Sequence, residues 1–211
     1  MRKQLVALVV MAGFWPVTWA QEIVIGQSVA LSGTNADIGR DMRDGALAVF
    51  AKFNAANPGR KIKLVTLDNA NNRERAAENT QALLGQHGAL ALFGYNSATN
   101  SVDALPLAAG ANALFFAPFS GSLALRNHPN VFTTRASYKE ETRKIIEAKR
   151  AVGADKAVIL HYDDEVGRSN YEAVASAYVE AGLAKPIGVA AKRGARLAPT
   201  AAEALLKSGA H

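Results

Sequence analysis

The 211-residue sequence contains no cysteine. It can therefore form neither a disulfide nor a thiolate metal site, and its stability must come from a packed core. The four histidines, at positions 87, 128, 161 and 211, stand far apart and lack the spacing of metal ligands. His161 ends a predicted strand, where a lone histidine favours a structural role. The acidic run 163–165 fits either a metal ligand set or a solvated helix start, and the helix start is the better match.

Signatures of common enzyme classes are also missing. The first strand-to-helix turn lacks the glycine fingerprint of dinucleotide binding, and there is no phosphate-binding loop of the Gly-x-x-x-x-Gly-Lys-Ser/Thr type. The Gly-x-Ser-x-Gly turn that presents a nucleophilic serine is absent as well. We therefore expect a protein that is not an enzyme and that uses no cofactor and no metal.

Basic residues are not gathered into a patch. The formal net charge is +6. Arg2 and Lys3 lie in the first twenty residues, which are described below as an export signal, and the chain without them carries +4. The other Lys and Arg residues are scattered through predicted helices without interleaved aromatic residues. This distribution argues against a nucleic-acid partner.

The first twenty residues have the pattern of a secretory signal peptide. Arg2 and Lys3 form a basic start, residues 5–14 are almost wholly apolar, and Ala20 precedes a polar stretch. The apolar run is shorter than the roughly 20 residues of a membrane-spanning helix, although an uncleaved anchor is the alternative. We expect cleavage after Ala20 and release into the periplasm, without the cysteine that a lipid anchor would require.

The rest of the chain alternates short apolar runs with longer amphipathic ones. The run 37–54, for example, repeats Ala46, Val49, Phe50 and Phe53 at helical spacing. Strands are expected at 23–30, 61–67, 90–93, 113–117, 131–134, 156–161 and 187–190, and helices at 37–54, 72–86, 99–109, 138–152, 165–181 and 199–207. Such alternation predicts an α/β fold, a doubly wound parallel sheet with right-handed crossovers.

The pattern also predicts a division of the chain. A boundary near 135–140 would separate a first lobe at 21–137 from a second at 138–211. The second part holds at most two strands, too few to bury both faces of their helices. We therefore expect a truncated second lobe.

Ligands of open parallel sheets bind beyond the carboxyl ends of the strands. The loops there carry Ser97, Thr99 and Ser120, whose hydroxyls and neighbouring backbone N–H groups suit a carboxylate. The alternative for Ser97 and Thr99 is simple helix capping, which is equally compatible with the sequence. Glu140, in the first turn of a helix, either balances the helix dipole or meets a ligand ammonium.

Several short motifs, in order along the chain, resemble the type I periplasmic binding proteins, the group of the leucine/isoleucine/valine-binding protein of ABC importers. The resemblance covers the N-terminal half of that family. The motifs are Ile-Val-Ile-Gly at 23–26 with Leu-Ser-Gly at 31–33, Gly-Arg-Asp-Met at 39–42 with Asp-Gly-Ala at 44–46, Leu-Asp-Asn at 67–69 with Ala-Ala at 76–77, Leu-Phe-Gly at 92–94, Phe-Ala-Pro at 116–118, Val-Phe at 131–132 with Thr-Arg at 134–135, and Tyr-Asp-Asp at 162–164 with Gly167.

The resemblance implies two Rossmann-like lobes that close on a small polar solute, an amino acid or a related molecule, and an ABC permease as partner. It places the ligand carboxylate at the loop 96–100, including Ser97, Ala98 and Thr99. The loop 119–121, which is Phe119, Ser120 and Gly121, would assist, and Glu140 is the nearest match to the ammonium ligand. Because binding needs both lobes, we expect the chain alone to bind weakly or not at all.

Three positions depart from the family pattern. Ile38 and Val166 stand where aromatic residues are common, and Ala98 replaces a small hydroxyl residue. These departures leave an amide, a short organic acid or an aromatic acid open beside a branched-chain amino acid. A ligand-sensing regulator on the same fold and an exported enzyme are the alternatives to a transport receptor. The export signal argues against the regulator, and the missing nucleophile–base pair argues against the enzyme.

Overall fold

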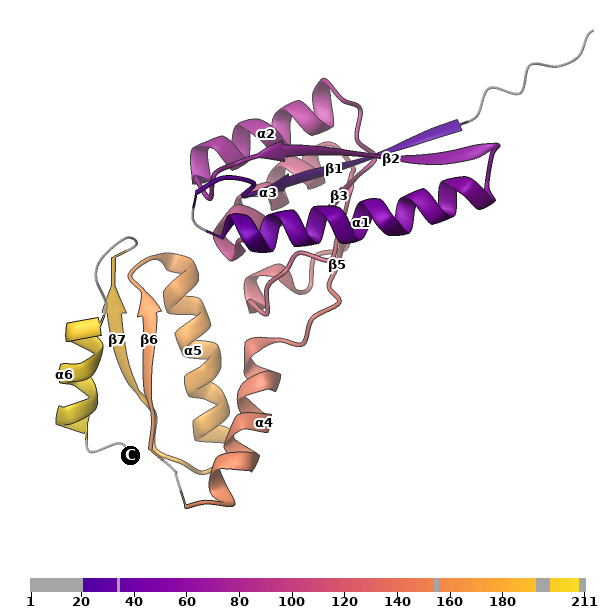
Figure 1. Cartoon of the computed structure of the whole chain (residues 1–211). Helices are drawn as coiled ribbons and strands as arrows, with labels where there is room; N and C mark the ends of the chain where they lie inside the picture. The colour runs from indigo at the N-terminus through magenta and orange to yellow at the C-terminus, as the bar shows by residue number, and fades with distance from the viewer. Residues whose placement is uncertain (1–20, 34, 154–155, 193–197, 209–211) are drawn as a thin grey trace, which may run out of the picture.

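The computed structural model of the chain describes residues 21–33, 35–153, 156–192 and 198–208 (Figure 1). The predicted signal peptide and its cleavage after Ala20 lie outside these residues. Strands and helices alternate in the order β1 (Gln21–Val29), α1 (Ala36–Ala56), β2 (Arg60–Asp68), α2 (Arg73–Gly85), β3 (Ala91–Phe93), α3 (Ala98–Gly110), β4 (Leu114–Phe116), the short 3-10 helix η1 (Leu123–Leu125), β5 (Val131–Phe132), α4 (Tyr138–Arg150), β6 (Val158–Tyr162), α5 (Glu165–Glu180), β7 (Ile187–Ala191) and α6 (Ala198–Ser208).

The described strands form two parallel sheets. The first has the order β2-β1-β3-β4-β5, and the second pairs β6 with β7. In the first sheet, Ile25 of β1 aligns with Leu64 of β2 and with Ala91 of β3. The predicted α/β fold with a parallel sheet is therefore confirmed. Strand order reverses beside β1, because β2 and β3 flank it on opposite sides, and this reversal opens a crevice beyond the carboxyl ends of β1 and β3.

Right-handed crossovers in opposite directions place α1 and α2 on opposite faces of the first sheet. In Figure 1, α1 lies on one side of β1 and β2, and α2 and α3 lie on the other. The α2–α3 side holds the main core, where Leu83, Leu92 and Phe115 are fully buried. Buried Tyr95 shares a hydrogen bond of 2.9 Å with the hydroxyl of Thr80, so its polar end is satisfied within that core.

The α1 helix buries a narrower face than its sequence pattern predicts. Ala46 is buried and Phe50 contacts Phe93, with ring centroids 6.2 Å apart. Val49, in contrast, is 65% exposed, although it shares the helical spacing of Ala46 and Phe50. No helix among the described residues is both long enough and apolar enough to cross a membrane.

Helices on both sides cover the second sheet. In Figure 1, α6 lies on one side of β6 and β7, and α5 with α4 lies on the other. Ile146 of α4 packs with Ala177 and Tyr178 of α5 in a small buried cluster. Leu160 and Ile187 remain at least 40% exposed, so this sheet buries its apolar side chains less completely than the first.

Two glycines let helices start directly against the strand that precedes them. A Cβ atom on Gly39 of α1 would lie 1.9 Å from the carbonyl oxygen of Ala30, and one on Gly167 of α5 would lie 2.1 Å from that of Tyr162. No side chain fits either gap, because these contacts are with backbone atoms. The first turns of α1 and α5 are thus held close to the ends of β1 and β6.

Candidate functional site

Residues that follow β1, β2, β3 and β6 line one pocket with a volume of about 280 Å³. Half of the lining comes from loops of the first sheet and half from β6, α4 and α5. The lining residues are Asn35, Asn71, Asn96, Ser97, Ala98, Tyr138, Tyr162, Val166, Gly167 and Asn170. The pocket therefore lies at the carboxyl edge of both sheets, where the strand order of the first sheet reverses.

Helix N-termini converge on this pocket. Asn35 and Ser97 are the N-cap residues of α1 and α3, Tyr138 is the first residue of α4, and Gly167 lies in the first turn of α5. Asn71 immediately precedes the N-cap of α2. Each helix brings partial positive charge and backbone N–H groups to its start. Together they favour a negatively charged group in the pocket.

Of the ten lining residues in the described part of the chain, none carries a charge. The helix starts also differ in how they are capped. The side chains of Asn72, Ser97, Ser137 and Asp164 each accept a hydrogen bond from their own helix, but that of Asn35 makes no such bond. The start of α1 is thus without a side-chain cap at the point where it borders the pocket.

Asn96 ties together the two loops at the strand reversal. Its side-chain oxygen accepts a hydrogen bond from the backbone N–H of Ala30 (3.4 Å), and its amide nitrogen donates to the carbonyl of Asn35 (3.5 Å). Both bonds are long, so each contributes little to the stability of the loops. The result is that the loops after β1 and β3 share one wall of the pocket.

Ser97 and Ala98, predicted as ligand contacts, both line the pocket. The Ser97 hydroxyl also accepts a hydrogen bond from the backbone N–H of Asn100 (3.4 Å), so capping and pocket lining coexist at this residue. Thr99 does not line the pocket and is only 6% exposed. Its predicted contact with a ligand is not supported by this placement.

In the described part of the chain, the predicted loop 119–121 contacts the pocket lining only through Gly121, which lies against Tyr138. Ser120 is buried, and its hydroxyl accepts a hydrogen bond from the backbone N–H of Ser122 (3.1 Å). The carbonyl of Gly121 accepts one from the backbone N–H of Tyr138 (2.8 Å), and a Cβ on Gly121 would lie 2.7 Å from the Tyr138 ring. Exposed Phe119 packs under the guanidinium of Arg135. None of the three loop residues lines the pocket.

Glu140 and Ile38 also lie outside the lining. The carboxylate of Glu140 accepts hydrogen bonds from the backbone N–H (2.7 Å) and the hydroxyl (2.8 Å) of Ser137, which together form a capping box. The backbone bond, followed by the hydroxyl bond, lowers the pKa of Glu140. This geometry favours the capping alternative over an ammonium contact. Ile38 is 42% exposed on α1.

Residues 22–207 match the model of the periplasmic binding protein family. The chain belongs to this family. The match covers most of the chain, and the resemblance seen in the sequence is thereby confirmed. No curated protein sequence matches the chain.

Solved structures of periplasmic binding proteins share the fold. A possible leucine/isoleucine/valine-binding protein from Rhodopirellula baltica SH 1 is 30% identical with a TM-score of 0.81, over 92% of this chain and 55% of the other. An extracellular ligand-binding receptor from Verminephrobacter eiseniae is 26% identical (TM-score 0.79; 90% and 55% of the two chains). An ABC-transporter solute-binding protein from Rhodopseudomonas palustris HaA2, in complex with p-hydroxybenzoic acid, is 19% identical (TM-score 0.78; 90% and 52%). The chain thus spans about half the length of these proteins.

Sequence reasoning for this family member missed half of the lining side chains. Asn35, Asn71, Tyr138, Tyr162 and Asn170 were not among the predicted contacts, although all of them line the pocket. Ligands were expected beyond the carboxyl ends of the strands, and a count of asparagines in the loops that follow β1 and β2 would have added Asn35 and Asn71. Tyr162 and Asn170 line the pocket because the carboxyl edge of the second sheet borders the same space as that of the first, which local sequence patterns do not indicate.

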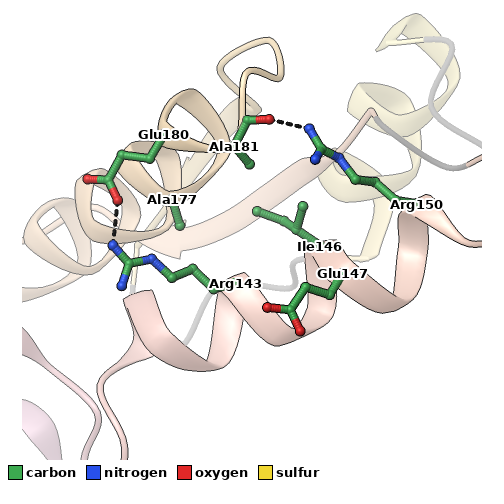
Figure 2. Close-up of a pocket in the computed structure, with 7 residues that line it drawn as sticks. All are labelled: Arg143, Ile146, Glu147, Arg150, Ala177, Glu180 and Ala181. Carbon is green, nitrogen blue, oxygen red and sulfur yellow. Dashed lines mark hydrogen bonds and ion pairs between the residues drawn. The ribbon is translucent and has the colours of Figure 1, made fainter.

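A larger hollow of about 410 Å³ lies between α4 and α5 (Figure 2). Its charged groups are already engaged: Arg143 pairs with Glu180 (2.6 Å), and Arg150 donates to the carbonyl of Ala181. All of its lining residues belong to α4 and α5 or directly follow α5, so this hollow does not lie at the carboxyl ends of the strands. Among the residues that the structure describes, no three His, Asp or Glu side chains are grouped to hold a metal ion. A hollow of about 340 Å³ adjoins the 280 Å³ pocket, because the two share Tyr138, Tyr162, Gly167 and Asn170. Of these three spaces in the described part of the chain, only the 280 Å³ pocket is lined from both sheets, so it is the better candidate in this periplasmic binding protein.

Proposed function

We propose that this chain is the ligand-receiving part of an extracytoplasmic solute-binding protein of an ABC importer. It takes a small amino acid, amide or organic acid between two lobes and does not catalyse a reaction. Residues 21–137 form the N-terminal lobe, and residues 138–211 belong to the second. The single observation that carries the proposal is the uncharged polar pocket, lined in equal parts from the two sheets and bordered by helix N-termini.

Transport also rests on the predicted export signal. A receptor delivered to the periplasm and cleaved after Ala20 would meet solutes there and hand them to a permease in the inner membrane. A ligand-sensing receptor on the same fold is the alternative function. Detection of the mature N-terminus at Gln21 in a periplasmic extract supports export, whereas an intact Met1 in the cytoplasm supports the regulator.

The first prediction concerns solute binding itself. Because the chain spans about half the length of the proteins it matches, we expect weak binding. In a titration of the isotope-labelled chain with 4-hydroxybenzoate, leucine, glutamine and acetamide at up to millimolar concentrations, at least one solute shifts the backbone amide signals of residues 96–98 and 166–167. Asn35→Gly removes a lining side chain while keeping the left-handed backbone (φ 67°) that this asparagine adopts, so it weakens this response.

The matched control is Asn127→Gly. Asn127 also has a left-handed backbone (φ 61°) but is exposed and does not line the pocket, so its variant binds like the wild type. Shifts confined to the α4–α5 hollow, or equal effects of the two variants, contradict the proposed site.

A further inference from the structure

Tyr138 is the first residue of α4 and lines the pocket, yet it is attached to the first lobe. Its backbone N–H donates to the carbonyl of Gly121 (2.8 Å). A Cβ atom on Gly121 would lie 2.7 Å from the Cδ1 atom of the Tyr138 ring, so the glycine backbone closes one side of this ring. The start of α4 is therefore fixed to the loop that follows β4.

The guanidinium of Arg135 lies against the same ring. Its central carbon is 5.3 Å from the centre of the Tyr138 ring and 5.4 Å from that of the Phe119 ring. Both distances are within the roughly 6 Å over which a cation attracts an aromatic face. Glu141 holds the guanidinium in place, because its carboxylate accepts two bonds from it, at 2.7 and 3.1 Å. Arg135 thus joins a ring of the first lobe to a ring at the pocket.

Both Arg135 and Phe119 are anchored in the first lobe. The backbone N–H of Phe119 donates to the carbonyl of Tyr95 (2.9 Å), whose ring is buried in the main core. The carbonyl of Arg135 accepts a bond from the guanidinium of Arg126, which also donates to the hydroxyl of Thr133 (2.6 Å). The contact that reaches the pocket ring therefore starts at the core of the first sheet.

We propose that Arg135 is a positioning residue, which holds the Tyr138 ring at the pocket without contacting the solute itself. The inference rests on the proposed solute-binding function. Arg135 does not line the pocket, whereas Tyr138 does. The loop 119–121, which the sequence predicted as a ligand contact, then acts on a bound solute through the position of this ring.

Arg135→Met keeps an unbranched stem but removes the charged, planar group. In a titration of the full chain with 4-hydroxybenzoate, leucine, glutamine and acetamide, this variant lowers the shift of residues 96–98 per added solute to about a third or less. In a Tyr138→Ala background the same substitution makes no further difference, because there is no ring to hold. Arg135→Lys restores part of the response, since it keeps a cation near both rings.

Arg73→Met is the matched control. Arg73 forms a similar two-bond pair, with Asp103, and does not line the pocket, so its variant responds like the wild type. An equal loss from Arg135→Met with and without the Tyr138 ring shows that Arg135 does not act through this ring and overturns the proposal. A wild-type response of Arg135→Met overturns it as well.

A second measurement needs no solute. In the wild type, the ring protons of Tyr138 give nuclear Overhauser effects to the α-protons of Gly121, and Arg135→Met weakens them. Where Arg135→Met does not fold, Arg135→Lys takes its place, with a smaller loss in the same direction. If no solute shifts the pocket residues, the proposed function fails, and this measurement alone decides the role of Arg135. Overhauser effects of wild-type strength in the folded variant contradict that role.

Discussion

Asparagine has two roles at the residue scale in this cleft. Asn35 and Asn71 adopt left-handed backbone conformations, with φ of 67° and 56°, which asparagine tolerates better than most other residues. They thereby turn the chain sharply between a strand and the next helix. Their amide side chains also line the pocket without adding charge. A ligand carboxylate thus meets donors in the loops, and none of the described residues that line this pocket is an anion.

Asp68 supports the same loops and gives a pH-dependent prediction. Burial raises the pKa of Asp68, but hydrogen bonds from the Ser32 hydroxyl and from the backbone N–H groups of Leu31, Ala70 and Ser32 outweigh it, so the pKa falls from 3.8 to about 2. Because the folded state holds the proton less tightly than the unfolded state, this stabilisation is complete above the ordinary pKa. It is lost as the pH falls through the folded value.

The expected loss is about 1 kcal/mol between about pH 5 and about pH 2, allowing for solvent screening. Urea unfolding across this range measures it. Asp68→Asn keeps an oxygen acceptor for the loop but cannot titrate, so its unfolding free energy falls less steeply with acid than that of the wild type. Parallel curves for the two proteins rule out this role for Asp68.

At the scale of elements, the docking of α1 on the end of β1 depends on one glycine. Gly39→Ala places a Cβ 1.9 Å from the carbonyl oxygen of Ala30, so the helix must move away from the strand. We expect a destabilisation of about 1–3 kcal/mol. Gly45, in the same helix, has no atom near its Cβ position, so Gly45→Ala stabilises by about 0.5–1 kcal/mol. Thermal or urea unfolding of the two variants gives opposite signs, and shifts of the same sign contradict the close approach.

Most elements could be predicted from the sequence, because apolar periodicity and turn residues act locally. Every expected strand and helix is present among the described residues, with ends that differ by a few residues. The η1 turn at Leu123–Leu125 was missed, since three residues carry no periodicity. Val49 follows the apolar spacing of α1 and is still 65% exposed, because spacing alone does not tell how wide a face the helix buries.

The site could be predicted only in part for the same reason. Ser97 and Ala98 follow a strand and begin a helix, a local pattern that places them at the pocket. Glu140 occupies a similar position, but Ser137 three residues earlier captures its carboxylate. The capping signature Ser-x-x-Glu was present in the sequence and could have indicated this pairing. The contributions of Tyr162 and Asn170 depend on how the two sheets face each other.

On the scale of the whole molecule, the cleft results from two parallel sheets whose carboxyl edges face a common space. The first sheet has five strands, and the second has two. Each contributes five residues to the pocket lining, so neither sheet alone forms the site. The chain spans about half the length of the structures it matches, and 55% of the protein from Rhodopirellula baltica. Figure 1 shows α4 leading from the first sheet to the second.

A crystal structure of the chain grown with the solute that gives the largest response in the titration tests the central claim most directly. We predict electron density for the ligand between Ser97 and Tyr162, with its polar group toward the first turns of α1 and α3. Ligand density between α4 and α5 instead, or an empty 280 Å³ pocket at saturating ligand, would contradict the account.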